Sequence, residues 1–453
     1  MGVRQSDLPL IKREDTWAII IALGLTLLIT FTFLSGGYAF FKAMAVNVPT
    51  WSNDVSKVTD ALAKSGLGIL YLFGFFILAF AFGAKVMGYN TQRFLTGFTV
   101  LFILSLIVTI LGSNKYMKDL QLETPVLALL LGMLIANIGT LPAWFKEALR
   151  TEYYVKTGII LLGATLPFTI IMSAGPLAMM QATIVAVVTF FAIYLAATKL
   201  FKLDPRFAAT LGAGGSICGV SGAIAVGGAC RAEKEHVSIA ISMVIIWAIA
   251  MVLFLPPMAM HLGMAPGPAG AWIGTSEFAD AAGFAAASQY NALAQVPGAD
   301  DTAVKTFTLM KVVGRDMFIG LWALMAAILS VTLWEKKSIG ESERVDYSQI
   351  WRRFPKFVIG FFIASIFATV VIMMLDPKTG SAFSKDALST VKTLRSWTFT
   401  WTFLAIGLTT RFRDLMNFGW KPLAAFTIGV IINVPLGYWL SNVIFQAYWM
   451  AVK

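Results

Sequence analysis

Charged side chains are scarce in this sequence. Of its 453 residues 13% are charged and 58% are hydrophobic, whereas soluble domains carry about 25% charged residues. Segments without any Asp, Glu, Lys, Arg or His cover 17–41, 65–84, 94–114, 124–145, 157–198, 207–230, 317–334, 357–375 and 422–452. Because about 20 apolar residues span the hydrocarbon core of a bilayer, this pattern excludes a soluble protein and indicates a polytopic membrane protein.

Cysteine and histidine are almost absent. Cys218 and Cys230 share one apolar segment, so no disulfide framework is indicated. His236 and His261 are too few for a histidine-rich metal site, and the chain has no nucleotide-binding phosphate loop. We therefore expect no metal, no cofactor and no direct use of ATP.

The net charge of +11 does not indicate nucleic acid, because the basic residues lie in short loops between apolar segments. There they set membrane orientation and contact lipid headgroups. A basic tail at 1–16 places the N-terminus in the cytoplasm. The first apolar segment is too long for a cleaved signal, so we expect a multi-pass protein of the bacterial inner membrane.

The organisation expected is all-α, with about 11 transmembrane helices plus two broken or re-entrant segments. The helices of 17–112 are expected at the periphery, and 120–448 is expected to form a transporter unit. Residues 335–356 read as a cytoplasmic loop. The long segment 157–198 is read as two helices that are joined by a turn at 173–176.

The stretch 207–230 is the least helical of the apolar segments. Seven glycines fall within 17 residues (Gly212, Gly214, Gly215, Gly219, Gly222, Gly227 and Gly228), each costing about 1 kcal/mol of helix propensity. We expect non-helical backbone over 214–221, with Ser216, Cys218 and Ser221 beside a ligand. A helix end exposed there would attract an anion. Tight helix packing is the alternative reason for these small residues.

Loop charges bear on how this stretch and a second unusual one, at 271–291, cross the membrane. The charge pattern favours two segments that enter from opposite sides and return, and full crossings of both are the alternative.

Four ionisable residues lie at membrane depth. Glu277 and Asp280 belong to the second segment, and Lys311 and Arg315 lie four apart on the following helix. Such residues usually face the interior and pair with one another. In one interpretation Lys311 and Arg315 bind an anion, while Glu277 or Asp280 couples transport to H⁺ or Na⁺. In the other, the four residues close the core as a structural cluster.

An internal repeat is indicated by two ungapped segments. Residues 163–175 and 407–419 share Gly, Thr, Phe, Met and Gly at matching positions, and they run in opposite directions under the expected topology. This pattern is typical of inverted-repeat secondary transporters, whose substrate site lies near the bilayer midplane. Chance is the alternative, because these residue types are common in membrane helices.

The sequence Gly215-Ser-Ile-Cys-Gly-Val-Ser221 resembles the signature of the YeiH-like proteins, a group described as sulfate exporters. The likeness continues through Trp272-Ile-Gly-Thr275 and Leu404-Ala-Ile-Gly-Leu-Thr-Thr410. The resemblance implies the inverted repeats and broken helices of bile-acid and cation-antiporter-type proteins. The chain departs from the family at Gly274-Thr-Ser-Glu277, where members carry His and an acidic residue, so the substrate or coupling could differ.

We therefore expect a secondary transporter, not an enzyme, that exports sulfate or a related oxyanion or organosulfonate by alternating access. The expected binding residues are Gly214, Gly215, Ser216, Cys218, Gly219, Ser221, Thr275, Lys311 and Arg315, with Glu277 and Asp280 for coupling. The partners are a small anion and membrane lipids, and a homodimer is left open. One alternative is a cation/proton antiporter that uses Glu277 and Asp280. An integral membrane enzyme is the other, disfavoured by the lack of a metal-spaced His/Asp/Glu cluster.

Overall fold

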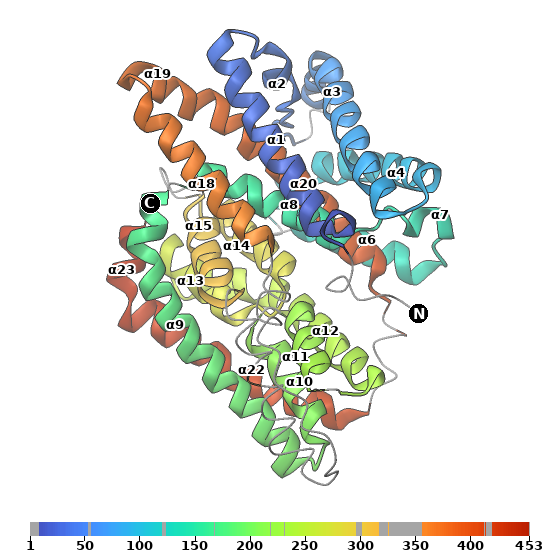
Figure 1. Cartoon of the computed structure of the whole chain (residues 1–453), viewed down its shortest axis with the longest axis vertical. Coiled ribbons are helices and arrows are strands. Elements are labelled where there is room, and N and C mark those ends of the chain that lie inside the picture. The colour runs from blue at the N-terminus through green and yellow to red at the C-terminus, as the bar shows by residue number, and fades with distance from the viewer. Residues whose placement is uncertain are drawn as a thin grey trace. The chain divides into compact units, whose positions relative to one another are not determined.

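The computed structural model describes residues 9–52, 56–119, 124–166, 168–217, 219–230, 232–295, 301–316, 325, 356–411, 413 and 419–452. Within these residues the chain is helical, and the one β-type contact is an isolated bridge between Trp51 and Asn114 (Figure 1). The chain divides into two compact units, of which unit 1 is Met1–Ile171 with Lys356–Arg411 and unit 2 is Met172–Pro355 with Phe412–Lys453. The stretch 120–448 is thus shared between both units, while the segments 207–230 and 271–291 lie in unit 2.

Unit 1 contains the N-terminal helices and four later helical elements. Its elements are η2 (Leu10–Lys12), α1 (Glu14–Ser35), α2 (Ala39–Met44), α3 (Ser56–Met87), α4 (Thr91–Gly112), α5 (Lys115–Asp119), α6 (Thr124–Ile138), α7 (Ala143–Lys146), α8 (Thr151–Thr165), α18 (Lys356–Met374), α19 (Pro377–Ala382), η7 (Phe383–Ala387) and α20 (Leu388–Thr409).

Unit 2 contains most of α9 (Phe168–Leu195) and both long and short helices. The others are η3 (Ala196–Leu200), α10 (Pro205–Ser216), α11 (Val220–Ala229), α12 (Lys234–His261), α13 (Pro266–Ser276), α14 (Asp280–Ala294), α15 (Thr302–Thr308), η4 (Leu309–Arg315), α22 (Trp420–Trp439), η8 (Leu440–Ile444) and α23 (Gln446–Ala451). Within this unit α10 and α11 pack together, α13, α14 and α15 pack together, and α12 packs against both groups (Figure 1).

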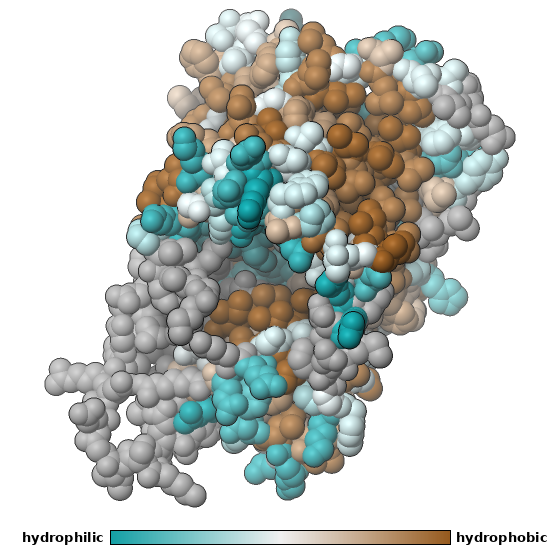
Figure 2. All heavy atoms as spheres, turned by 90° about the vertical axis from the view of Figure 1, so that its right-hand side faces the viewer, coloured by the Kyte–Doolittle hydropathy of each residue, from teal (hydrophilic) through white to brown (hydrophobic). Residues whose placement is uncertain are grey.

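Seven helical stretches in the described part are long and apolar enough to cross a membrane. They are Glu14–Ser35, Ser56–Met87, Thr91–Gly112, Gly175–Leu200, Glu235–His261, Lys356–Met374 and Trp420–Ile444. Large apolar side chains on them point outwards, such as Leu78 on α3 and Met374 on α18, which are 71% and 81% exposed. Broad apolar areas are visible on the face shown in Figure 2. The expectation of an all-α polytopic membrane protein is confirmed.

Three helices of unit 1 begin at the same end. The carboxylate of Asp15, at the start of α1, accepts a hydrogen bond of 2.6 Å from Nζ of Lys156 on α8 and one of 3.1 Å from the backbone N–H of Lys356 on α18. The sequence assigns all three positions to one side of the membrane from loop charge alone. At the other end, Tyr38 donates to the carbonyl of Asp386.

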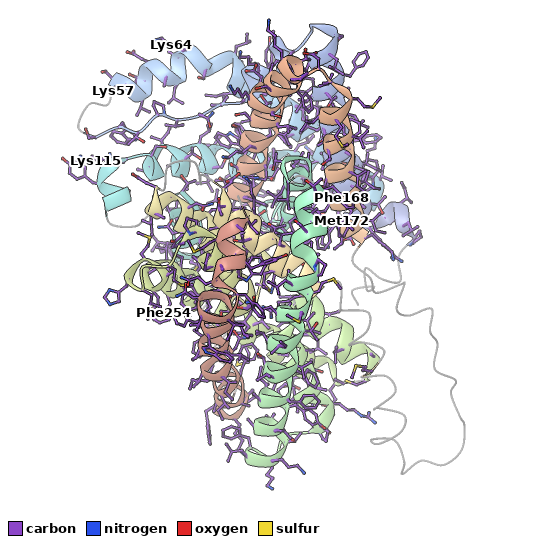
Figure 3. The ribbon with its side chains drawn as sticks, turned by 90° about the vertical axis from the view of Figure 1, so that its left-hand side faces the viewer. Lys57, Lys64, Lys115, Phe168, Met172 and Phe254 are labelled. Carbon is purple, nitrogen blue, oxygen red and sulfur yellow. The ribbon has the colours of Figure 1, made fainter. Side chains whose placement is uncertain are left out.

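Exposed lysines lie where α3 begins and α4 ends. The backbone N–H of Trp51 donates to the carbonyl of Ser113, so the two helix ends are adjacent. Lys57, Lys64 and Lys115 are exposed around this junction, as Figure 3 shows. Such a cluster suits anionic lipid headgroups.

The prediction of a turn at 173–176 is wrong. Helix α9 runs without interruption from Phe168 and includes Pro176, whereas α8 ends at Thr165 and Leu166 has extended backbone. Leu166 precedes a proline in the sequence, and a residue before proline is disfavoured in the helical region. The sequence pattern identified the two helices, but it placed the boundary between them at 173–176, whereas the first helix already ends at Thr165.

Close helix approaches in unit 1 occur at the first glycine of each matched segment. A Cβ on Gly163 would lie 2.4 Å from the carbonyl oxygen of Phe361 on α18, and one on Gly407 would lie 2.3 Å from that of Leu129 on α6. Six residues of 407–419 lie outside the described residues. The inverted repeat therefore stays a prediction.

Candidate functional site

The first unusual segment folds as a helical hairpin. Its two arms, α10 and α11, run antiparallel, so that Cys230 at the end of α11 lies beside Thr210 and Arg206 near the start of α10. The thiol of Cys230 is 4.0 Å from the hydroxyl of Thr210 and 3.7 Å from the carbonyl of Arg206. The segment therefore returns to the end from which it started, as the loop charges favoured.

The break at the tip of this hairpin is shorter than expected. We predicted non-helical backbone over 214–221, but α10 continues to Ser216 and α11 begins at Val220. Gly214 and Gly215 are helical, and their missing side chains admit Val244 of α12 and Ile193 of α9. Gly219 alone needs glycine for its backbone, since its φ is +69°. Close packing thus explains the glycines of α10, and backbone geometry explains the one at the tip.

The second unusual segment forms a matching hairpin from α13 and α14. The hydroxyl of Tyr290, late in α14, donates to the carbonyl of Met264, just before α13. The arms are joined by Glu277–Ala279. Like α10, α13 begins with a proline, at Pro266, and ends with a serine, Ser276.

The two hairpins meet at their tips. A Cβ on Gly219 would lie only 2.4 Å from the carbonyl oxygen of Phe278 and 2.8 Å from a methyl group of Val244, which is near the middle of α12. The first hairpin opens toward the start of α12, where Ala232 binds the carbonyl of Gly227, and the second opens toward its end. They therefore enter from opposite ends of a helix that is long enough to span a bilayer.

Arg315 joins the two tips by hydrogen bonds to backbone carbonyls. Its Nε donates to Ser216 in the first hairpin (3.1 Å), and its Nη1 donates to Gly274 (3.0 Å), Thr275 (2.9 Å) and Glu277 (3.2 Å) in the second. These carbonyls end α10 and α13, where a helix has unsatisfied acceptors and partial negative charge. A guanidinium with only 1% exposure is thus held by two helix ends.

Lys311, four residues before Arg315 on the π-helical element η4, also donates hydrogen bonds to backbone carbonyls of both tips. Its Nζ donates to the carbonyls of Ile217 (3.2 Å), Glu277 (3.0 Å) and Phe278 (3.4 Å), and it pairs with Asp280 at 3.7 Å. Of the two interpretations of the charged residues, this geometry favours the structural cluster for Lys311 and Arg315. Their charge still lies at the centre of the tips, where it offsets the carbonyl dipoles.

Glu277 is completely buried between these groups. Its Oε1 accepts hydrogen bonds from the backbone N–H groups of Phe278 (2.9 Å) and Ala279 (3.1 Å), at the entrance to α14. Its Oε2 has no hydrogen-bond partner in the described part of the protein. One carboxylate oxygen is therefore fixed by the backbone, and the other is left for a ligand, water or proton.

Two serine hydroxyls at the tips also lack a hydrogen-bond partner among the described residues. Ser216 and Ser276, the last residues of α10 and α13, are fully buried, and neither Oγ has a hydrogen-bond partner among the described residues. Ser276 was not identified from the sequence. Alignment of the two proline-initiated, serine-terminated helices would have found it, because both serines occupy the same place in their hairpins.

The other expected site residues are placed as follows. The hydroxyl of Thr275 donates to the carbonyl of Trp272 within its own helix (2.9 Å), so its one hydrogen is used and its oxygen can act only as an acceptor. Cys218 lies outside the described residues, as does the side chain of Ser221. The structure thus brings together at the tips Ser216, Gly219, Glu277, Asp280, Lys311 and Arg315.

Comparison with other proteins gives the same picture of a membrane protein. The family model described as conserved hypothetical protein 698 matches residues 96–426. A UPF0324 membrane protein of Rhodopirellula baltica is 32% identical over 392 residues, which cover 85% of this chain and 69% of the relative. A UPF0324 membrane protein of Nitratidesulfovibrio vulgaris is 31% identical over 415 residues, which cover 88% of this chain and 69% of the relative.

A third relative, from Nitrosomonas europaea, is 28% identical, and the alignment covers 94% of both chains. That match extends into the first hundred residues, beyond the region of the family model. No solved structure was found to match. On the extent of the family match and the identity to these relatives, the chain belongs to the UPF0324 family of membrane proteins.

Proposed function

We propose that this protein is a secondary transporter of small anions that works by alternating access. The observation that carries the proposal is the meeting of two oppositely entering hairpins halfway along a spanning helix, at buried polar groups that have no hydrogen-bond partner among the described residues. Broken helices near the bilayer midplane are typical of secondary transporters, because bare backbone at that depth is tolerated only within protein or beside a cavity.

The chemistry of the tips supports an anion as the substrate. The N-terminal end of α11 lies at the junction, where its first N–H groups have no helical acceptor and carry partial positive charge. The hydroxyls of Ser216 and Ser276 add neutral donors. Lys311 and Arg315 offset the negative ends of α10 and α13. A small oxyanion would thus meet donors on one side without facing bare carbonyl dipoles on the other.

The resemblance of the 215–221 sequence to the YeiH-like proteins supports sulfate, or a related oxyanion or organosulfonate, as the cargo, and export as its direction. The proposal includes the bacterial inner membrane with a cytoplasmic N-terminus, and anionic lipids around Lys57, Lys64 and Lys115. It requires neither cofactor nor nucleic acid, and no enzymatic step.

Transport of radiolabelled sulfate into liposomes that contain the purified protein tests this proposal. We expect Ser216→Ala and Ser276→Ala each to lower uptake at least tenfold, because each removes one hydroxyl from the tips. The control is Ser389→Ala, since Ser389 is exposed in unit 1. Equal uptake by all variants, or none by the wild type with sulfate and ethanesulfonate, would refute the proposal.

A cation/proton antiporter is the second candidate. It is favoured by two carboxylates three residues apart at the tips, Asp280 and Glu277, since Oε2 of Glu277 has no hydrogen-bond partner among the described residues. In liposomes with a pH-sensitive dye, this function predicts proton release when Na⁺ or K⁺ is added, and loss of that release in Glu277→Gln. Cation-driven proton movement without any anion present would favour this candidate.

A further inference from the structure

The backbone oxygens that would bind a metal cation at the hairpin tips are already bound to fixed side-chain cations. In secondary transporters with broken helices, unwound carbonyls and helix C-terminal ends coordinate Na⁺. Here the corresponding carbonyls accept hydrogen bonds from Lys311 Nζ or Arg315; they belong to Ser216, Ile217, Gly274, Thr275, Glu277 and Phe278.

An added Na⁺ would have to share these oxygens with an ammonium or guanidinium group about one hydrogen-bond length away. Like charges at such a distance repel strongly in a buried site. The tips are therefore unsuited to a coupling metal ion. Lys311 and Arg315 supply permanently the positive charge that a bound cation supplies elsewhere.

Glu277, in the turn between α13 and α14, differs in the surroundings of its two carboxylate oxygens. Oε1 is held by two backbone N–H groups, and Oε2 is buried with no partner among the described residues. The backbone carbonyls of Ser216 and Glu277 accept hydrogen bonds from the same guanidinium, so the two residues lie at one junction of the tips. An ionised Oε2 would repel an oxyanion there, whereas a protonated Oε2 would donate a hydrogen bond to it.

The charges around Glu277 lead to the same requirement. Asp280 lies at the start of α14, and Lys311, Arg315 and Asp316 lie on or next to η4; the described residues of α10, α11, α12 and α22 near the tips add no charged group. Two cations and two carboxylates cancel formally. Glu277 alone then decides whether the tips are negative or neutral before the anion arrives.

We propose that the anion binds together with one proton, which lies between Oε2 of Glu277 and an oxygen of the anion, and that no metal cation takes part. The proton comes from solvent when the anion binds and returns to it on release. This inference rests on the proposed anion transport and specifies its coupling ion.

The test measures proton uptake on anion binding by the purified full-length protein. Sulfate and ethanesulfonate are added as tetramethylammonium salts, free of metal cations, in weakly buffered detergent solution, because neither anion titrates between about pH 5 and 9. At a pH above the titration of Glu277, where the unliganded carboxylate is ionised, we expect uptake of about one proton per anion bound. Affinity, measured by thermal stabilisation, should fall about tenfold per pH unit above the titration of Glu277, and Na⁺ should change neither quantity.

Glu277→Gln separates this role from a merely structural one. The amide of glutamine donates a hydrogen bond as the protonated acid would, so binding should persist without proton uptake and with a flat pH profile. The control Glu235→Gln removes an exposed carboxylate at the start of α12 and should keep the wild-type slope.

Several outcomes would overturn the inference: anion binding by the wild type without proton uptake at a pH above the titration of Glu277, a requirement for Na⁺, or an unchanged pH slope in Glu277→Gln. If that variant fails to fold, the two wild-type measurements still decide. Absence of binding by both anions at every pH would instead overturn the anion-transport proposal itself, and this inference with it.

Discussion

Replacement of Arg315 by glutamine tests whether the guanidinium supports the tips or serves chiefly as a ligand for the anion. Arg315 donates to four carbonyls in two hairpins, and a shorter neutral amide cannot reach both. Hydrogen bonds from charged groups contribute about 1.5–3 kcal/mol each, but they are not additive. Loss of one partner from a buried charged cluster costs about 3–5 kcal/mol. We expect Arg315→Gln to lower the free energy of unfolding by about that amount.

The measurement is reversible unfolding in mixed detergent micelles, with no anion present. Arg93→Gln is the matched control, because Arg93 is exposed on α4 and should tolerate the change within about 0.5 kcal/mol. If Arg315→Gln were as stable as the wild type and lost only anion-dependent stabilisation, the carbonyl contacts would contribute little. The guanidinium would then act mainly on the substrate, contrary to our reasoning.

Two further predictions concern the hairpins. In the same unfolding assay, Gly219→Ala should destabilise the protein more than Gly263→Ala. Both glycines have positive φ, so each alanine adds backbone strain of about 1–2 kcal/mol, but only Gly219 lacks space for a Cβ. Equal losses of stability would contradict the contact between the hairpin tips. In a Cys218→Ala background, Thr210→Cys should form a disulfide with Cys230, which mass spectrometry detects as the loss of two hydrogens. If the segment were one continuous helix, residues 210 and 230 would lie about 30 Å apart and no disulfide would form.

The sequence was informative where composition alone decides the structure. Absence of charge identified the membrane helices, and loop charge favoured two opposed, returning segments before any geometry was known. The exact break could not be read from glycine density, because Gly214 and Gly215 remain helical when neighbouring helices pack against them. Propensity describes an isolated helix, and tertiary contacts override it.

The candidate site was predicted in its residues more than in their roles. Arg315 and Glu277 were expected beside Ser216, and all three lie at the tips. That Arg315 binds carbonyls could not be deduced, since hydrogen bonds to backbone depend on where two helices end in space. Ser276 was missed because its significance comes from its position in a hairpin, which residue type does not reveal.

The bonds from Arg315 to the first hairpin also bear on how the protein is made. Ser216 precedes Arg315 by 99 residues in the chain, so the first hairpin leaves the ribosome long before its main cationic partner. Backbone carbonyls left unsatisfied in hydrocarbon cost several kcal/mol each. We therefore expect the nascent first hairpin to stay at the membrane surface or in a water-accessible insertion site. It would settle to its final depth only after Lys311 and Arg315 have been synthesised, which makes burial of this segment a late event in biogenesis.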